Sequence, residues 1–154
     1  MVFKYNSAKA VSYANSYVGR DNPFYKKFEN GEDCNFVSQC LLAGSENVSD
    51  EQEDGWFYEN EKKYSKSWSD QSKLFYHLLT ARKGPFGRSA SKSNLCVGDL
   101  VFFSNENKNC VGIVTKLEND EVFFLAKEQN FKLKKVQNEG NFDIKYLHIL
   151  GVKK

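Results

Sequence analysis

The sequence is short of the residues that build metal sites and membrane spans. Of its 154 residues only two are histidine and two are proline, and none of its four cysteines forms a Cys-x-x-Cys pair. Both histidines, His77 and His148, lie far from the cysteines in sequence. The spacing of a zinc site is therefore absent, and we expect neither a metal nor a cofactor. No apolar run approaches the length of a bilayer, so we expect no membrane span.

A strong excess of one charge is also missing. The net charge is +2, and basic residues are interleaved with acidic ones. Because nucleic-acid binding needs a basic stripe along the phosphate backbone, we expect no nucleic-acid partner. The first seven residues contain no basic segment followed by an apolar one, which predicts no signal peptide in this chain. The protein is then either cytoplasmic or secreted with its leader removed, and the oligomeric state is left open.

What the chain does contain is bulky core material. Hydrophobic residues make up 40% of it and aromatic residues 15%. A length of 154 residues with this composition suits one domain, residues 1–154, around one core.

Helical spacing of apolar residues dominates the first half. It predicts helices over residues 7–18, 34–44 and 71–82, with Ser7 as one N-cap and Ser69 or Asp70 as another. The acidic segment 45–55 has no apolar periodicity and is expected to be a surface loop. It either connects two elements or forms the rim of a cleft that selects a cationic ligand. The segment 83–94, rich in small residues, is expected to be a linker.

Strand patterns dominate the second half. Alternating or β-branched segments predict strands over residues 100–103, 110–117, 121–126, 131–136 and 143–150. Helices that precede strands in this way indicate the α+β class. We therefore expect three N-terminal helices packed on a C-terminal antiparallel sheet of about five strands.

Cys34 is the candidate nucleophile. It follows the acidic residue Asp33 at the expected start of the second helix. Unpaired N–H groups give a helix N-terminus a partial positive charge, which favours the thiolate form of a cysteine there. Two tryptophans, Trp56 and Trp68, follow in aromatic segments that could close the core, line a substrate groove, or do both.

Seven short motifs occur in order across most of the chain. They are Tyr13-Ala14, Asn22-Pro-Phe-Tyr25, Asp33-Cys-Asn-Phe-Val-Ser-Gln39, Trp56-Phe-Tyr58, Ser67-Trp68, Gly98-Asp99-Leu-Val-Phe102 and Asn109-Cys-Val-Gly-Ile-Val114. This series resembles the "putative amidase domain" family of bacterial proteins. The resemblance implies a papain-like fold related to NlpC-type and CHAP endopeptidases, with cysteine amidase or peptidase activity of the cell-wall hydrolase type.

The chain departs from the family pattern at two positions that the resemblance makes catalytic. In the family pattern one residue separates the cysteine from Asn-Phe-Val, whereas Cys34 directly precedes Asn35. The family's histidine corresponds to Cys110, and a cysteine cannot act as an imidazole base. The family's next polar site, often a histidine after an alanine, corresponds to Lys127. Asp33, Asn35, Trp56 and Trp68 are then candidate binding residues.

Three functions remain open at this point. We expect a degenerate amidase with impaired catalysis that retains a cleft for a peptide, a peptidoglycan fragment or a protein partner. The first alternative is an active hydrolase that uses Cys34 with His77, His148 or Lys127 as its base. The second is a redox-sensitive module in which Cys34 and Cys110 form a disulfide.

Overall fold

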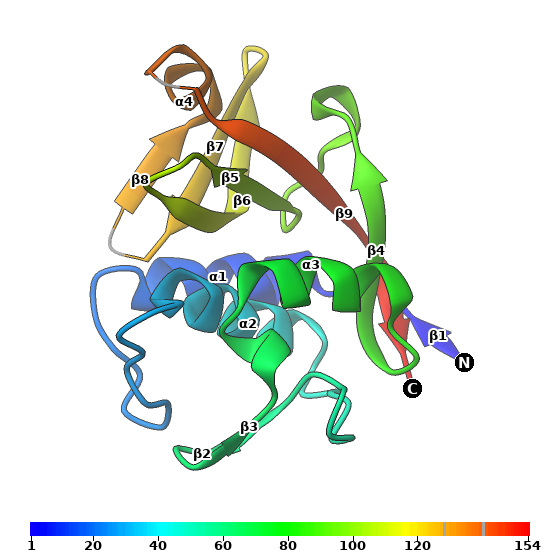
Figure 1. The fold of residues 1–154 in the computed structure, drawn as a ribbon. Coiled ribbons are helices and arrows are strands. Elements are labelled where there is room, and N and C mark those ends of the chain that lie inside the picture. The colour runs from blue at the N-terminus through cyan, green and yellow to red at the C-terminus, as the bar shows by residue number, and fades with distance from the viewer. Residues whose placement is uncertain (128, 140) are drawn as a thin grey trace.

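The computed structural model describes residues 1–127, 129–139 and 141–154, and these residues form an α+β fold as predicted (Figure 1). The helices are α1 (Ser7–Tyr17), α2 (Glu32–Gly44), α3 (Gln71–Thr80) and α4 (Leu133–Glu139), with short 3-10 turns η1 (Lys66–Trp68) and η2 (Lys92–Asn94). The strands are β1 (Val2–Phe3), β2 (Tyr58–Asn60), β3 (Lys63–Tyr64), β4 (Gly84–Ala90), β5 (Leu100–Ser104), β6 (Asn109–Glu118), β7 (Glu121–Ala126), β8 (Gln129–Lys132) and β9 (Asp143–Lys153).

The main sheet has more strands than the five expected. Within the described residues it contains seven, in the order β1-β9-β5-β6-β7-β8 with β4 also paired to β9, and all pairs are antiparallel. The prediction of a linker over residues 83–94 is wrong for its first part, because Gly84–Ala90 forms the strand β4 and pairs with β9. Its small residues give no strand pattern of their own. The partner is the long strand β9, which pairs β5 along one part and β4 along most of its length (Figure 1).

The prediction of a strand over residues 131–136 is also wrong beyond Lys132. β8 ends at Lys132, and the helix α4 begins at Leu133. Leu133 and Val136 are both buried, and a separation of three residues brings them to the same face of a helix. The apparent period of two was therefore ambiguous over so short a segment.

Two apolar cores lie on opposite faces of the sheet. Side chains of β5 alternate between them, with Leu100 and Phe102 in the first core and Val101 and Phe103 in the second. The first core lies between the sheet and the helices α1, α2 and α3, which group together on one side in Figure 1. The second core is covered by α4.

Helix α2 is the most deeply buried helix of the first core. Each residue from Cys34 to Leu41 is buried, so both of its sides are in contact with protein. Its C-terminal end approaches α1 closely, since a Cβ atom on Gly44 would lie 3.0 Å from Cβ of Ala10. The N-cap of α1 is Asn6 and not the expected Ser7, because the Asn6 side chain accepts a hydrogen bond from the backbone of Lys9.

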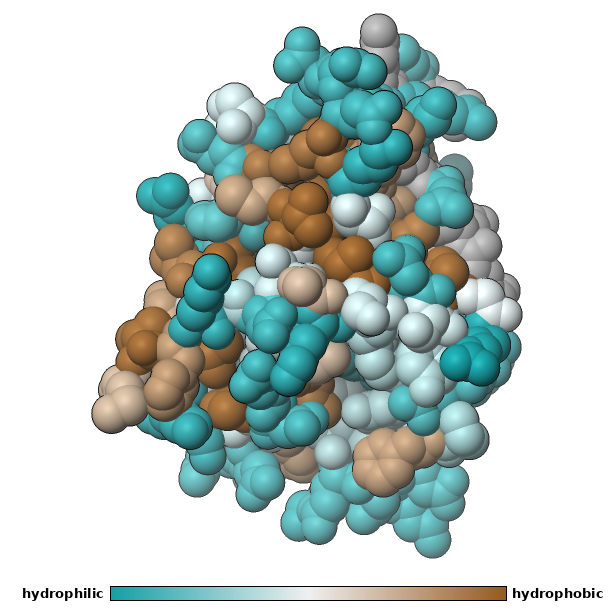
Figure 2. Space-filling view, turned by 180° about the vertical axis from the view of Figure 1, so that it is seen from behind, coloured by the Kyte–Doolittle hydropathy of each residue, from teal (hydrophilic) through white to brown (hydrophobic). Residues whose placement is uncertain are grey.

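The surface is mixed, with one apolar area near the chain ends. Met1, Val2 and Phe3 are exposed, and Figure 2 shows hydrophobic surface gathered on that side of the molecule. Among the described residues, we find no helix with the length and apolar character needed to cross a bilayer.

Candidate functional site

The first turn of α2 presents two faces to two different parts of the protein. On one face, Cys34 Sγ lies 3.8 Å from the carbonyl oxygen of Ser67. Four residues later on that face, Ser38 Oγ donates to the carbonyl of Trp68 at 2.8 Å. Side chains at i and i+4 share a helix face, so Cys34 points toward the segment Ser67–Trp68 together with Ser38.

Asp33 points toward the sheet. Successive helical residues are turned by about 100°, so Asp33 and Cys34 project in different directions. The Cys110 thiol and the backbone of Lys127 both lie close enough to the Asp33 carboxylate to lower its pKa. Asp33, not Cys34, is therefore the α2 residue that the structure brings together with Cys110.

Burial governs the protonation of the cysteines. Cys34 is fully buried, and desolvation, followed by repulsion from Asp70, raises the pKa of its thiol well above the usual value. Desolvation and the adjacent Asp33 raise the pKa of Cys110 to about 12. The thiolate that the helix N-terminus was expected to favour at Cys34 is thus disfavoured, because desolvation outweighs the helix dipole.

Lys127 is engaged elsewhere. Its ammonium group donates to the carbonyl oxygens of Tyr17 and Arg20, at 2.9 and 2.8 Å, and forms an ion pair with Asp21 at 3.1 Å. An ammonium group has three donors, and these three acceptors account for them. The Lys127 side chain holds the loop after α1, and only its backbone N–H reaches Asp33.

The other expected binding residues lie inside the fold. Trp56 and Trp68 have no exposed surface and stack with ring centroids 5.1 Å apart. Asn35 Oδ1 accepts from the Trp68 indole at 2.8 Å, and Ser38 Oγ accepts from that of Trp56 at 3.1 Å. The structure therefore places these residues in the contact between α2 and the aromatic segments, which is the core-closing role considered above.

A separate hollow of about 1020 Å³ opens beside α3 and the acidic loop. Its wall includes His77, whose Nε2 atom is buried and has no hydrogen-bond partner among the described residues. Burial lowers the pKa of His77, so the ring is neutral at neutral pH. Asp50 and Asp54 also line the hollow, and both are paired with Arg82. The acidic loop thus forms part of a cleft wall.

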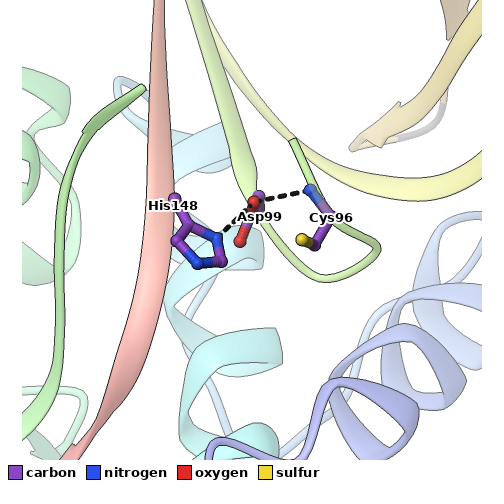
Figure 3. Close-up of side chains that lie close together, drawn as sticks. All are labelled: Cys96, Asp99 and His148. Carbon is purple, nitrogen blue, oxygen red and sulfur yellow. Dashed lines mark hydrogen bonds and ion pairs between the residues drawn. The ribbon is translucent and has the colours of Figure 1, made fainter. Parts of the chain in front are cut away.

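The fold also assembles three residues that spacing along the chain did not connect. Cys96, Asp99 and His148 come from a turn, from the residue before β5 and from β9, and each offers a metal-ligating atom within 4.8 Å of the others (Figure 3). The sequence pointed to Asp99 only within a family motif and to His148 only as an alternative base. The signal that could have found the cluster was the antiparallel pairing of β5, which directly follows Asp99, with β9, which contains His148.

Comparisons with known proteins agree with the motif series. The family model described as "Putative amidase domain" matches residues 4–146. The sequence is also similar to the uncharacterized protein YhbB of Bacillus subtilis (strain 168), with 31% identity over 108 residues that cover 68% of this chain and 34% of that protein. The chain thus spans about a third of this relative's length. No solved structure gives a significant match.

Proposed function

We propose that this chain, which belongs to the putative amidase domain family, is a catalytically impaired amidase-like domain that binds a peptide or glycopeptide. The observation that carries the proposal is the pair formed by Asp33, at the start of α2, and Cys110 of β6. A cysteine hydrolase needs a thiolate beside an imidazole. Here a carboxylate, Asp33, lies beside a thiol, Cys110.

The geometry of Cys34 supports the same conclusion. The groups that act on the pKa of its thiol are Asp70, Ser38 and Asp33, besides burial itself, and none of them is an imidazole. A fully buried thiol cannot reach a substrate carbonyl without movement of the Ser67–Trp68 segment. All four cysteines are free, and Asp33 occupies the side of α2 that faces Cys110. A disulfide between Cys34 and Cys110 would therefore require the first turn of α2 to rotate.

The hollow beside α3 is the proposed binding cleft. The neutral imidazole of His77 lies in its wall and is unpartnered at Nε2 within the described part of the chain. That atom would bind an amide group of a ligand once the side chains covering it move, because a buried polar atom gains most from a new hydrogen bond. Tyr64 and Tyr76 supply aromatic surface, and Glu53 adds negative charge at the wall. These groups favour a peptide-like ligand that carries an amine.

The impaired catalysis is tested by hydrolysis of soluble peptidoglycan fragments. We expect no release of peptide above the blank from the unmodified protein or from Cys34→Ala. In native protein near neutral pH, iodoacetamide should label exposed Cys96 first and leave Cys34 protected, as measured by mass spectrometry of digested peptides. Turnover that Cys34→Ala abolishes would show that the domain is an active enzyme.

A pair of variants tests which position faces residue 110. Cys110→His alone should not accelerate labelling of Cys34, since that thiol lies on another face of α2. Asp33→Cys combined with Cys110→His places a thiol opposite an imidazole, and we expect residue 33 to become the most rapidly alkylated cysteine. Rapid labelling of Cys34 in the single variant would contradict the assignment of the two faces.

Binding is tested separately with a stem peptide, alone and attached to its sugar, by isothermal titration calorimetry. Loss of one hydrogen bond in His77→Gln and of aromatic surface in Tyr76→Ala should each weaken binding about threefold to tenfold. Leu150→Ala, at another exposed apolar residue outside the hollow, serves as the control and should bind normally. Equal affinity in all four proteins would place the ligand elsewhere.

A further inference from the structure

The cluster of Cys96, Asp99 and His148 lies outside the pair and the hollow described above (Figure 3). Asp99 lies at its centre and is 2% exposed. Its Oδ1 accepts from the backbone N–H of Ile149 at 3.0 Å. Its Oδ2 accepts from the backbone N–H of Cys96 at 2.7 Å and faces His148 Nδ1 at 2.8 Å. Asp99 thus holds the other two residues in place before any ligand arrives.

The backbone around the cluster is firmly supported. A tight turn joins Cys96 to Asp99, with the Asp99 N–H bonded to the Cys96 carbonyl at 3.0 Å. Gly98 has a φ of +95°, which L side chains rarely adopt, and a Cβ there would lie 2.7 Å from Ser7. On the other side, His148 belongs to β9, where it pairs with Arg88 of β4. The three ligating atoms are therefore presented by hydrogen-bonded backbone segments, with Cys96 exposed to solvent.

The chemistry of the three groups indicates which ligand they suit. A thiolate sulfur, an imidazole nitrogen and a carboxylate oxygen are the ligand types of Zn²⁺, whereas Mg²⁺ and Ca²⁺ prefer oxygen alone. Three protein ligands leave a fourth position for water or another ligand.

We propose that Cys96, Asp99 and His148 form a binding site for Zn²⁺ or a similar borderline-soft divalent cation. The cation would replace the contact of 2.8 Å between Asp99 Oδ2 and His148 Nδ1, and a proton on Nδ1 would move to Nε2. The Cys96 S–H proton leaves to solvent as the metal–sulfur bond forms. Asp99 keeps its bonds to the backbone of Cys96 and Ile149, which orient its carboxylate toward the cation.

Co²⁺ is the probe, because thiolate ligation gives it a sulfur-to-metal charge-transfer band in the near ultraviolet. We expect one Co²⁺ per chain with this band, and displacement by Zn²⁺. Cys96→Ser should remove the band. His148→Gln should weaken Co²⁺ binding by at least about tenfold, because loss of even a group that only supports a metal ligand costs about that much affinity. Asp99 is left unchanged because it is buried and accepts from two backbone N–H groups, so that its substitution would impair folding.

Matched controls carry the same changes at other positions. Cys110→Ser and His77→Gln each remove one cysteine or histidine outside the cluster, and both should bind Co²⁺ as the unmodified protein does. The circular dichroism spectrum of each variant shows whether it is folded. Absence of the band in the unmodified protein, or its persistence in folded Cys96→Ser, would overturn the proposal. Neither result bears on the peptide-binding proposal, which concerns another part of the molecule.

Discussion

At the scale of single residues, Asp33 has an unusual environment for a carboxylate. Desolvation raises its pKa, and the nearby Cys110 thiol opposes that rise only in part. Folding therefore favours the protonated form of Asp33. Its contribution to stability is most favourable at low pH, where the unfolded chain is protonated as well. That contribution is lost as the pH rises from the unfolded pKa to the higher folded pKa.

Asp33→Asn removes this titration. We predict that the stability of the variant relative to the unmodified protein increases between about pH 3 and pH 7, a range that contains the ordinary pKa of aspartate. Urea unfolding at several pH values measures the difference in the free energy of unfolding. A difference that does not change with pH would show that Asp33 is not perturbed in the folded protein.

Asp21 provides a control with the opposite sign. The hydrogen bond from Lys127 lowers the pKa of Asp21, so its ionised form is favoured by folding. Asp21→Asn should therefore lose stability relative to the unmodified protein as the pH rises over the same range. Because the Asp21 side chain is 52% exposed, the change should be smaller than that for Asp33.

At the scale of elements, the contact between α2 and the aromatic segments depends on Ser38. Its hydroxyl donates to the carbonyl of Trp68 and accepts from the indole N–H of Trp56, and all three residues are fully buried. Ser38→Ala leaves both partners without a hydrogen bond inside the core. We predict a loss of about 2–6 kcal/mol in the free energy of unfolding, from about 1–3 kcal/mol for each of the two buried polar groups left unsatisfied.

The matched control is Ser12→Ala on the exposed surface of α1. Alanine has the higher helix propensity, so this change should alter the free energy of unfolding by no more than about 0.5 kcal/mol, and in the stabilising direction. Urea unfolding followed by tryptophan fluorescence measures both variants. A similar small effect at Ser38 would mean that water or another group replaces its hydrogen bonds.

The same helix shows how far the sequence could predict the site. The apolar spacing after Cys34 predicted α2, because residues such as Val37 and Leu41 recur on a helical face. Which of Asp33 and Cys34 faces the sheet could not be read from that spacing. With residues 34–41 all buried, no polar side of α2 remains to reveal its orientation. The contacts of Ser38 with both tryptophans, which connect distant segments, determine it.

The strands show a similar limit. Segments with strong β-branched or apolar alternation, such as β6 and β7, were predicted close to their observed bounds. β4 was missed because the strand pairs with β9 through its backbone. Backbone pairing requires no alternation of apolar and polar residues in a segment rich in small residues. The cluster around Asp99 was missed for a related reason, since it depends on strand pairing between residues about fifty positions apart.

At the scale of the whole molecule, one sheet is shared by two cores. Leu100 belongs to the first core and Leu133 to the second, and neither has exposed surface. Because β5 contributes alternate side chains to both cores, loss of packing on one face should weaken the strand pairing that supports the other. We therefore expect residues 1–154 to unfold as one cooperative domain, as their length and composition predicted.

Both tryptophans lie in the first core, so tryptophan fluorescence reports on that core alone. We predict that Leu133→Ala, in the second core, lowers the urea midpoint measured by fluorescence and by far-ultraviolet circular dichroism to the same extent. Leu100→Ala should give the same coincidence, with a loss of about 2–5 kcal/mol in either variant from the cavity left behind. If Leu133→Ala shifted the circular dichroism transition but left the fluorescence transition in place, the second core would be an independently unfolding unit. The prediction of a single domain would then be wrong.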